Sequence, residues 1–320
     1  MLRAMVTVIV WFLCQPAVAD PVFRGICEAS AAVYLGEQAG HRHFAVASDE
    51  TNVVRTYDLD SGGVGATFGF RRVSTYDKSD LEAAARVGDL IYWISSQSIN
   101  SGGDDKPKRR VLLASRLSWG PDGPDLAAVG IGTGLRDGLV GATRAALEVL
   151  NVEGLAATGD GGLLIGLRAP LDDGMAQVVA LINPEETLVQ MEPVFGPVLR
   201  LDLGGYGIRS LEGLAAGGYL VVAGPVADSD DLFRLYLWDG GADRPRLIGG
   251  PDLTGLRLEA AFEAADGTVM LLSDDGGPCE KRGLHDDGPG GEKDRLFRWV
   301  SFTPPWPTAG RAAASPAGSA

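Results

Sequence analysis

Residues 151–167, NVEGLAATGDGGLLIGL, have the pattern of a β-hairpin. The residues that follow Glu153 are small and apolar, Gly159-Asp160-Gly161-Gly162 supplies a turn, and residues 163–167 are continuously apolar. Glycine and aspartate in such a cluster favour a tight turn between two strands. A continuous apolar run is typical of a strand with both faces covered, so the hairpin is expected inside a layered all-β fold.

The phrase around Glu153 recurs along the chain. An apolar residue or cysteine, a glutamate and a small residue occur together at Cys27-Glu28-Ala29, Leu81-Glu82-Ala83, Val152-Glu153-Gly154, Leu211-Glu212-Gly213 and Leu258-Glu259-Ala260. Successive glutamates are 54, 71, 59 and 47 residues apart. Repeats of this length are typical of propeller blades. The sequence therefore predicts a single β-propeller with five blades, and the longest interval, which contains residues 135–147, leaves a short helix or a degenerate sixth blade open.

Further strands are expected in each repeat. A third strand is predicted at residues 53–59, 110–117, 177–182, 233–238 and 295–300, and a fourth at residues 66–71, 126–130, 188–191 and 244–248. The fifth repeat instead runs into Thr303-Pro304-Pro305, and proline donates no ladder hydrogen bond. We therefore expect residues 21–25 to supply the missing strand and to close the ring.

The N-terminal residues predict export. Arg3, the apolar residues 6–14 and Ala17-Val18-Ala19 form a secretory signal with a small-residue cleavage site, too short to span a bilayer. The predicted organisation is a signal peptide at residues 1–19, a propeller domain at 20–302 and a disordered Pro/Ala-rich tail at 303–320. We expect a periplasmic or secreted protein without membrane insertion after cleavage.

Charge and cysteine content narrow the function further. The formal net charge of −14 opposes binding to nucleic acid. Cys27 and Cys279 remain after signal cleavage, and an even pair in an oxidising compartment is a candidate disulfide. Two separate buried thiols are the alternative, although circular closure of the propeller would bring the two cysteines together.

A candidate metal site follows from the topology. In a propeller, the beginnings of the innermost strands and the ends of the second strands open on one face, so the repeated glutamates are expected to ring one mouth of the central channel. Oxygen-rich clusters suit Ca²⁺ or Mg²⁺. The candidate metal ligands are Glu82, Glu153, Glu212, Glu259, Glu263 and Asp274. Alternatively, Arg168, Arg209 and Arg257 could pair with the glutamates and form a purely structural collar.

Residues that break the repeat are the candidates for ligand binding. They end the second strands and enter loops, where rigid scaffolds place binding groups. The candidates are Arg168, Ser96, Gln97, Asp274 and Asp275. Arg168 could bind a carboxylate or a phosphate with its planar guanidinium, or it could pair with Glu153. No catalytic residue is identified.

Several runs together resemble a bacterial exported family known only as a domain of unknown function. They are Asp80-Leu81-Glu82, residues 92–96, 151–155 and 164–170, Ala223-Gly224-Pro225, and residues 235–238 and 272–276. More distantly, the Val-Glu-Gly and Leu-Glu-Gly phrases are similar to phytase-like esterase propellers. The first resemblance implies a propeller without a known activity, and the second implies a metal-assisted phosphoester hydrolase.

Three functions therefore stay open. The first is a binding module whose carboxylate-rich channel mouth takes a small molecule or an envelope protein. The second is the phosphoester hydrolase, with Glu153, Glu212, Glu259 and Asp274 holding the cation and Arg168 the phosphate. The third is a structural scaffold without a ligand, in which the glutamates only fix the blade geometry.

Overall fold

The computed structural model describes residues 21–100, 102–227, 229, 232–241, 244–284 and 291–305. The predicted signal peptide and residues 306–320 of the predicted tail lie outside these ranges. No helix in the described part of the chain is both long enough and apolar enough to cross a membrane.

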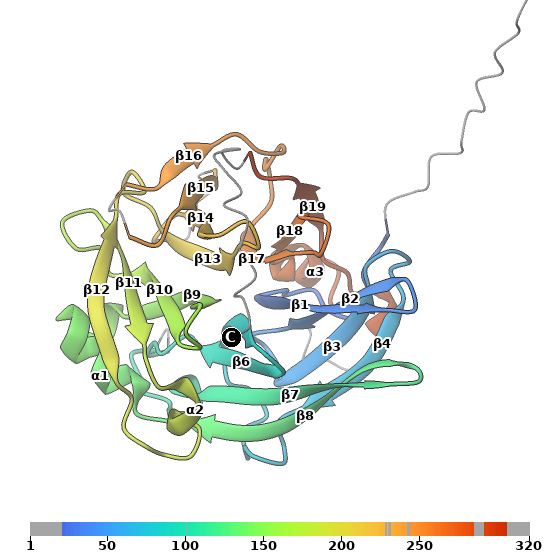
Figure 1. Ribbon diagram of the computed structural model, residues 1–320, viewed down its shortest axis with the longest axis horizontal. Coiled ribbons are helices and arrows are strands. Elements are labelled where there is room, and N and C mark those ends of the chain that lie inside the picture. Colours follow the sequence, from blue (N-terminus) through green and yellow to red (C-terminus); the bar gives the residue numbers. More distant parts are fainter. Residues whose placement is uncertain are drawn as a thin grey trace, which may run out of the picture.

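Five antiparallel sheets form a ring around a central channel (Figure 1). The first blade contains β1 (Ala31–Gln38), β2 (His41–Ala47), β3 (Val53–Asp58) and β4 (Val64–Gly69). The second contains β5 (Leu81–Val87), β6 (Leu90–Ser95), β7 (Leu112–Gly120) and β8 (Gly123–Gly132). The third contains β9 (Asn151–Ala157), β10 (Leu163–Ala169), β11 (Ala176–Leu181) and β12 (Phe195–Leu201).

The ring continues with the fourth blade, β13 (Gly207–Gly213), β14 (Tyr219–Gly224), β15 (Arg234–Trp238) and β16 (Arg246–Ile248). The fifth blade has three strands, β17 (Leu258–Glu263), β18 (Val269–Ser273) and β19 (Trp299–Phe302). Short helices in the connections are η1 (Pro107–Arg109), α1 (Leu135–Thr143), η2 (Leu147–Val149), α2 (Pro184–Thr187), α3 (Gly276–Glu280) and η3 (Glu292–Asp294). The prediction of an all-β, five-bladed propeller is confirmed.

The core lies between the blades. Leu155 and Ile165 of the third blade pack with Ile94 of the second, and Val222 of the fourth packs with Leu271 of the fifth. Burying a side chain of this size contributes about 1.5–3 kcal/mol. Each inner hairpin therefore has both faces covered, as the continuous apolar runs predict.

Two segments differ from the expected strands. The long interval after the second blade contains α1, whose Leu135 and Leu139 are buried, and no sixth blade. The fourth strand predicted at residues 188–191 is wrong, because Pro184 begins the short helix α2 and the strand that follows is β12. Proline at the first helical position and glutamates in the first turn favour a helix there.

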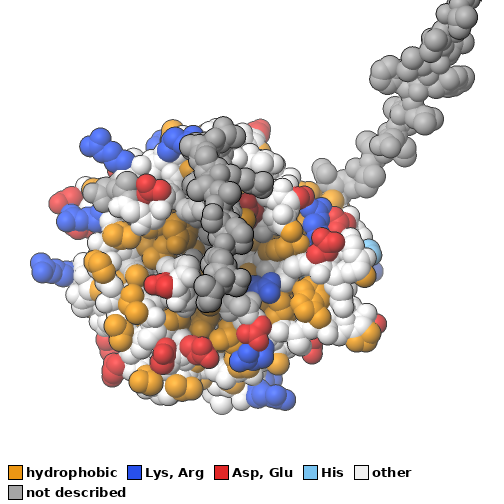
Figure 2. All heavy atoms as spheres, viewed as in Figure 1, with side chains coloured by type: hydrophobic (Ala, Val, Ile, Leu, Met, Phe, Trp, Pro, Cys, Tyr) orange, Lys and Arg blue, Asp and Glu red, His pale blue; other side chains and the backbone are white. Residues whose placement is uncertain are grey.

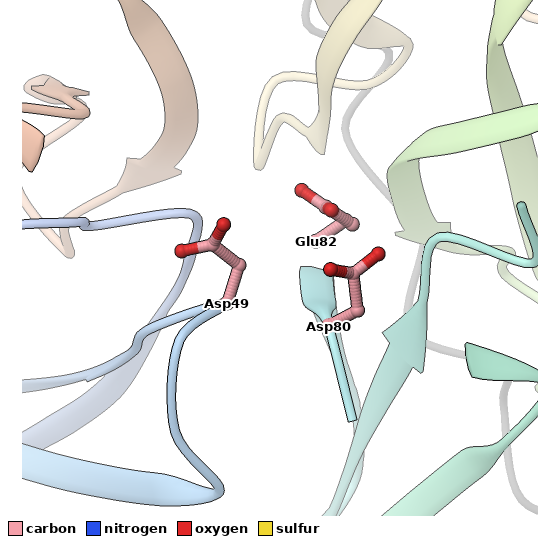
Figure 3. Close-up of side chains that lie close together, drawn as sticks. All are labelled: Asp49, Asp80 and Glu82. Atoms are coloured by element: carbon pink, nitrogen blue, oxygen red, sulfur yellow. The ribbon is translucent and has the colours of Figure 1, made fainter. Parts of the chain in front are cut away.

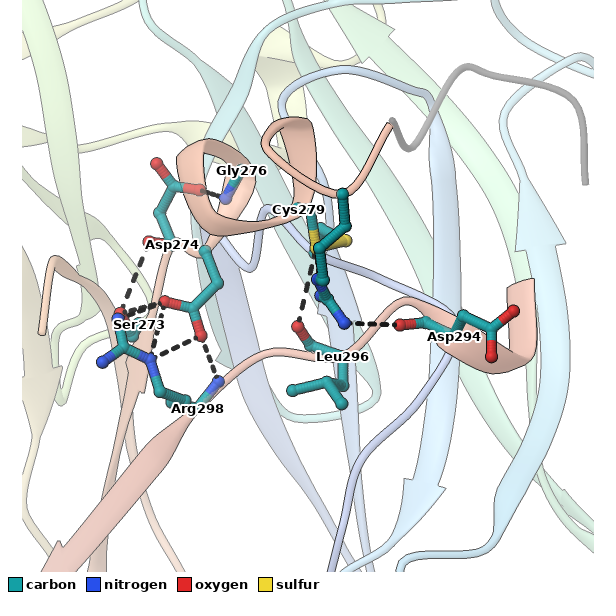
Figure 4. The surroundings of a disulfide bond; sticks show 10 residues. Ser273, Asp274, Gly276, Cys279, Asp294, Leu296 and Arg298 are labelled. Carbon is teal, nitrogen blue, oxygen red and sulfur yellow. Dashed lines mark hydrogen bonds and ion pairs between the residues drawn. A yellow bond between two sulfur atoms is a disulfide. The ribbon is translucent and has the colours of Figure 1, made fainter. Parts of the chain in front are cut away.

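Residues from both ends of the described chain close the ring. Arg24 forms a β-bridge with Leu296, and the Phe23 ring stacks on Phe297 with centroids 5.7 Å apart. Cys27 and Cys279 form a disulfide with Cα atoms 6.2 Å apart, and Cys279 lies in α3 (Figure 4). The N-terminal segment thus joins the fifth blade, although through isolated bridges and the disulfide in place of a regular strand.

Charge is mixed on the face shown in Figure 2. Acidic and basic side chains both lie around the periphery of that face, with hydrophobic side chains between them. This face therefore has no region in which charge of a single sign dominates.

Candidate functional site

A β-bulge near the beginning of the innermost strand sets the position of three glutamates. In β5 the pairing with β6 skips Glu82, which is the extra residue of the bulge. Glu153 in β9 and Glu259 in β17 occupy the same extra position. Bulges re-aim a side chain at the rim of a sheet. The recurring glutamate is therefore part of the bulge in blades two, three and five.

The other two copies of the motif do not share this register. In β13 the extra residue is Arg209, and Glu212 lies near the opposite end of that strand. In the first blade the corresponding residue is Ser30, whose amide donates to a carbonyl of β2 (3.2 Å). The prediction that the five glutamates ring one mouth is wrong for Glu212, whereas Glu28 lies outside the bulge but reaches this mouth through a β-bridge to Asp274.

An arginine–glutamate collar spans blades three, four and five. Arg168 donates to Glu153 (Nη1 to Oε1, 3.0 Å), and Arg209 contacts the other oxygen of Glu153 (Nε to Oε2, 2.8 Å). Arg209 also pairs with Glu259. Glu153 and Arg209 are only 3% and 5% exposed, and burial raises the pKa of Glu153 to about 7 although both arginines oppose the shift. The structural collar considered from the sequence is thus present, without Arg257.

The other side of the mouth carries a cluster of carboxylates from blades one and two. Asp49 follows β2, Asp80 precedes β5, and Glu82 lies in its bulge (Figure 3). One oxygen from each lies within 4.8 Å of the others. Asp80 pairs with Arg109 (2.7 Å), whereas Asp49 Oδ1 is buried and accepts no hydrogen bond from the described residues. We call Asp49, Asp80 and Glu82 the acidic cluster.

Burial makes Asp49 and Glu82 hard to ionise. It raises the pKa of Asp49 well above its ordinary value, and the charges of Glu259 and Glu28 add to the shift. Burial and then the charge of Asp80 raise the pKa of Glu82 in the same direction. Arg109 compensates the charge of Asp80, and a proton or a cation would relieve the repulsion that remains, because the arginines of the collar are engaged with Glu153 and Glu259.

The repeat in the sequence predicts Glu82 as a metal ligand but does not predict Asp49 or Asp80, which lie beside it. Asp49 corresponds to Asp274, since Asp49 follows Ser48 directly after β2 and Asp274 follows Ser273, the last residue of β18. Asp80 precedes Glu82 by two residues. Comparison of the strand ends could have found both residues, but their convergence depends on the packing of two blades.

Ser96 and Gln97 build the corner after β6. Both are buried, with Ser96 Oγ 2.8 Å from Ser98 Oγ and Gln97 Nε2 donating to Ser95 Oγ (3.0 Å). Arg109, which pairs with Asp80, also donates to Ser98 Oγ (2.8 Å). These side chains connect the loop before β7 to the acidic cluster.

Asp274 and Asp275 have different surroundings although they are adjacent. Asp275 is 2% exposed and accepts hydrogen bonds from the backbone N (2.7 Å) and the guanidinium of Arg298 (Figure 4). Asp274 accepts from the amide of Gly276 (2.8 Å), and burial together with the charge of Glu259 raises its pKa to about 7. Asp275 thus anchors the approach to β19, and Asp274 adds a carboxylate to the mouth.

Glu212 and Glu263 lie at the opposite mouth of the channel. They line a cavity of about 310 Å³ with Arg86 and Tyr34, and the amide of Glu263 donates to Glu212 Oε1 (2.9 Å). Burial raises the pKa of Glu212 to about 8. The predicted metal ligands are therefore divided, with Glu82, Glu153, Glu259 and Asp274 at one mouth and Glu212 and Glu263 at the other.

Several solved structures resemble this chain at low sequence identity. Myxococcus xanthus glutaminyl cyclase has 11% identity and a TM-score of 0.45, over 88% of this chain and 98% of that chain. The PQQ-bound aldose sugar dehydrogenase from Streptomyces coelicolor has 14% identity and a TM-score of 0.44, over 89% and 97%. U3-55K has 14% identity and a TM-score of 0.42, over 82% and 80%. Similarity at this level assigns no function.

Sequence comparison gives one family. No curated protein matches the chain. The similarity to phytase-like esterases that the glutamate phrases suggest is not supported by these comparisons. Residues 148–251, which contain all of blades three and four, match the family described as "Protein of unknown function (DUF3616)".

Proposed function

We propose that this propeller is a binding module that holds a divalent cation, of the Ca²⁺ class, at the acidic cluster. The observation that carries the proposal is the buried Asp49 Oδ1, which has no hydrogen-bond donor in the described chain and belongs to a carboxylate that lies close to those of Asp80 and Glu82 (Figure 3). A buried carboxylate oxygen without a donor is costly unless another positive group satisfies it. Besides the cation, the module would bind a second ligand, a small molecule or an envelope protein, over this mouth.

The spacing of the cluster suits the ion. Ca²⁺ binds oxygen at about 2.4 Å, so two oxygens on opposite sides of one ion are about 4.8 Å apart. The three oxygens of the cluster lie within 4.8 Å of one another, so one ion could contact all three. For Mg²⁺ the corresponding span is about 4.2 Å, and Mg²⁺ also requires a stricter octahedral geometry, which makes it the second choice.

The electrostatics favour the ion in the same way. At 4.8 Å and an effective dielectric constant of about 20, two carboxylates repel by about 3.5 kcal/mol. Arg109 compensates one of the three charges. A divalent cation would balance the remaining two, from Asp49 and Glu82.

The test combines metal analysis, calcium titration and melting curves. We expect the purified protein to retain calcium, to lose it to a chelator, and to regain roughly 5 °C or more of melting temperature when calcium reaches about 100-fold above its Kd. Asp49→Asn should weaken calcium binding by at least about tenfold. Without metal, the same variant should be more stable than the wild type above pH 7, because it removes a carboxylate that is costly to ionise.

A matched control lies at the opposite mouth. Glu212→Gln also neutralises a carboxylate whose pKa burial raises, but at a site distant from the cluster, so it should leave calcium affinity unchanged. Absence of calcium binding by the wild type, or equal affinity of Asp49→Asn, would contradict the proposal. A scaffold whose acidic cluster is protonated would then be the better description.

No observation favours the phosphoester hydrolase over a binding module. That activity would need Arg168 to receive a phosphate. Arg168 instead donates through Nε to the carbonyl of Val226 (2.9 Å) and through Nη1 to Glu153 (3.0 Å). These contacts describe a positioning role within the collar.

A further inference from the structure

A second cavity at the acidic-cluster mouth lies between blades four and five. Its volume is about 280 Å³, and its lining includes three arginines and no carboxylate of the described chain. The remaining wall is largely apolar. The three arginines are Arg168, Arg209 and Arg257, and the large apolar side chains of the lining are Leu232, Phe233 and Leu256. We call this cavity the arginine pocket.

Blade four supplies the floor of the pocket by replacing the bulge glutamate with Arg209. The Arg209 guanidinium carbon lies 5.8 Å from the centroid of the Phe233 ring. Gly224 makes this arrangement possible, because a Cβ there would lie 2.7 Å from both Arg209 Cγ and Phe233 Cε1. The arginine and the aromatic ring thus need a glycine where other blades carry Asp49, Arg168 or Asp274.

Arg257 differs from the other two arginines. Arg168 and Arg209 are engaged by the collar, whereas Arg257 is exposed and forms no ion pair within the described part of the chain. Its backbone is fixed, since its amide donates to Ser273 Oγ (3.0 Å) and its carbonyl accepts from the amide of Asp274 (2.7 Å). A guanidinium with an anchored root at the edge of an apolar cavity can bind a carboxylate through two parallel hydrogen bonds.

Asp274 lies close enough to Arg257 to interact with it electrostatically, but the two side chains form no ion pair. The described lining of the arginine pocket thus presents three guanidinium groups and no carboxylate.

We propose that the arginine pocket binds a small organic acid, with its carboxylate on Arg257 and its apolar body against Phe233 and Leu256. The cavity volume lies at the lower end for ligand pockets, which limits the ligand to a small molecule. The lining combines arginines with apolar side chains, so the pocket selects for an acid with an apolar part. The proposal does not depend on cation binding at the acidic cluster.

Calorimetric titration with three probes at fixed ionic strength tests the class of ligand. Benzoate carries both features, benzamide is its neutral counterpart, and inorganic phosphate carries charge without the apolar body. We expect benzoate to bind with a Kd in the millimolar range or tighter, and the other two probes to bind at least about tenfold more weakly. Equal binding of benzamide or of phosphate would overturn the proposed class, and undetectable benzoate binding would overturn the site.

Two variants locate the binding. Arg257→Gln should weaken benzoate binding at least about tenfold while leaving the melting temperature near that of the wild type, because the side chain is exposed. Arg116→Gln, which removes an exposed arginine of β7 in the second blade, is the matched control and should bind benzoate normally. Unchanged affinity of Arg257→Gln would place binding elsewhere and reject the assignment. Calcium binding by Arg257→Gln should stay intact, so failure of the two proposals can be distinguished.

Discussion

Replacing Glu212 by glutamine should change how the stability of the protein depends on pH. Burial raises the pKa of Glu212 from its ordinary value of 4.5 to about 8. Between those values the folded state keeps the proton and the unfolded state has lost it. The contribution of Glu212 to the free energy of unfolding is therefore highest below pH 4.5. It falls as the pH rises through this window and levels off above pH 8.

The size of the effect follows from the slope. One proton of difference corresponds to about 1.4 kcal/mol per pH unit, so the wild type should lose roughly 2 kcal/mol through this group between pH 5 and pH 7. Glutamine cannot ionise, yet its carbonyl can still accept the hydrogen bond that the amide of Glu263 donates to Glu212 Oε1 (2.9 Å). Glu212→Gln should thus fold in the same way and lack this part of the pH dependence.

Urea unfolding at pH 5, 6 and 7 with the disulfide intact measures the effect. The difference in unfolding free energy between variant and wild type should grow by roughly 2 kcal/mol from pH 5 to pH 7 in favour of the variant. Glu148→Gln, at an exposed position in η2, is the control and should follow the wild-type profile. If the curves of Glu212→Gln and wild type are parallel, the reasoning about a buried, protonated carboxylate at this mouth is wrong.

Two further predictions concern the collar and the closure. Arg209→Met should destabilise the protein by about 3–5 kcal/mol at pH 8, because it leaves Glu153 and Glu259 without their shared partner. The loss should be smaller at pH 5, where Glu153, whose pKa burial raises to about 7, is protonated. Urea midpoints at both pH values check this, and equal losses would exclude an electrostatic role. Cys27→Ala with Cys279→Ala should lower the unfolding free energy by roughly 5 kcal/mol, the loop-closure value for cysteines 252 residues apart. Differential scanning calorimetry of the double variant tests it, and an unchanged melting temperature would mean that the bridge does not constrain the unfolded chain.

Much of the fold could be predicted because its signals are local. Turns rich in glycine and the continuous apolar strands determine the hairpins, and the spacing of the repeat determines the blades. The segment after β11 could not be predicted in this way. An apolar residue such as Leu188 fits a strand as well as the buried position that it occupies after α2, so its hydrophobicity does not distinguish the two. The proline and the two glutamates of α2 were the better signal.

The site was predictable only in part, for reasons of register. Residues 212–216 match residues 153–157 letter by letter, but strand pairing places Glu212 and Glu153 at opposite mouths. Arg209 is the extra residue of the bulge in blade four, and no recurring sequence phrase marks it. Asp49 and Asp80 lie 31 positions apart and meet only through the packing of neighbouring blades.

Closure of the ring by Cys27 and Cys279 has a consequence for the order of folding. The segment that completes the fifth blade is made before the first blade, and its partner around Leu296 is made after β18. This segment must therefore stay without its partner until the four preceding blades have been synthesised. We expect the middle blades to form early from local contacts and the joining of the two ends to be the slow, final step, since contacts of such long sequence separation form late.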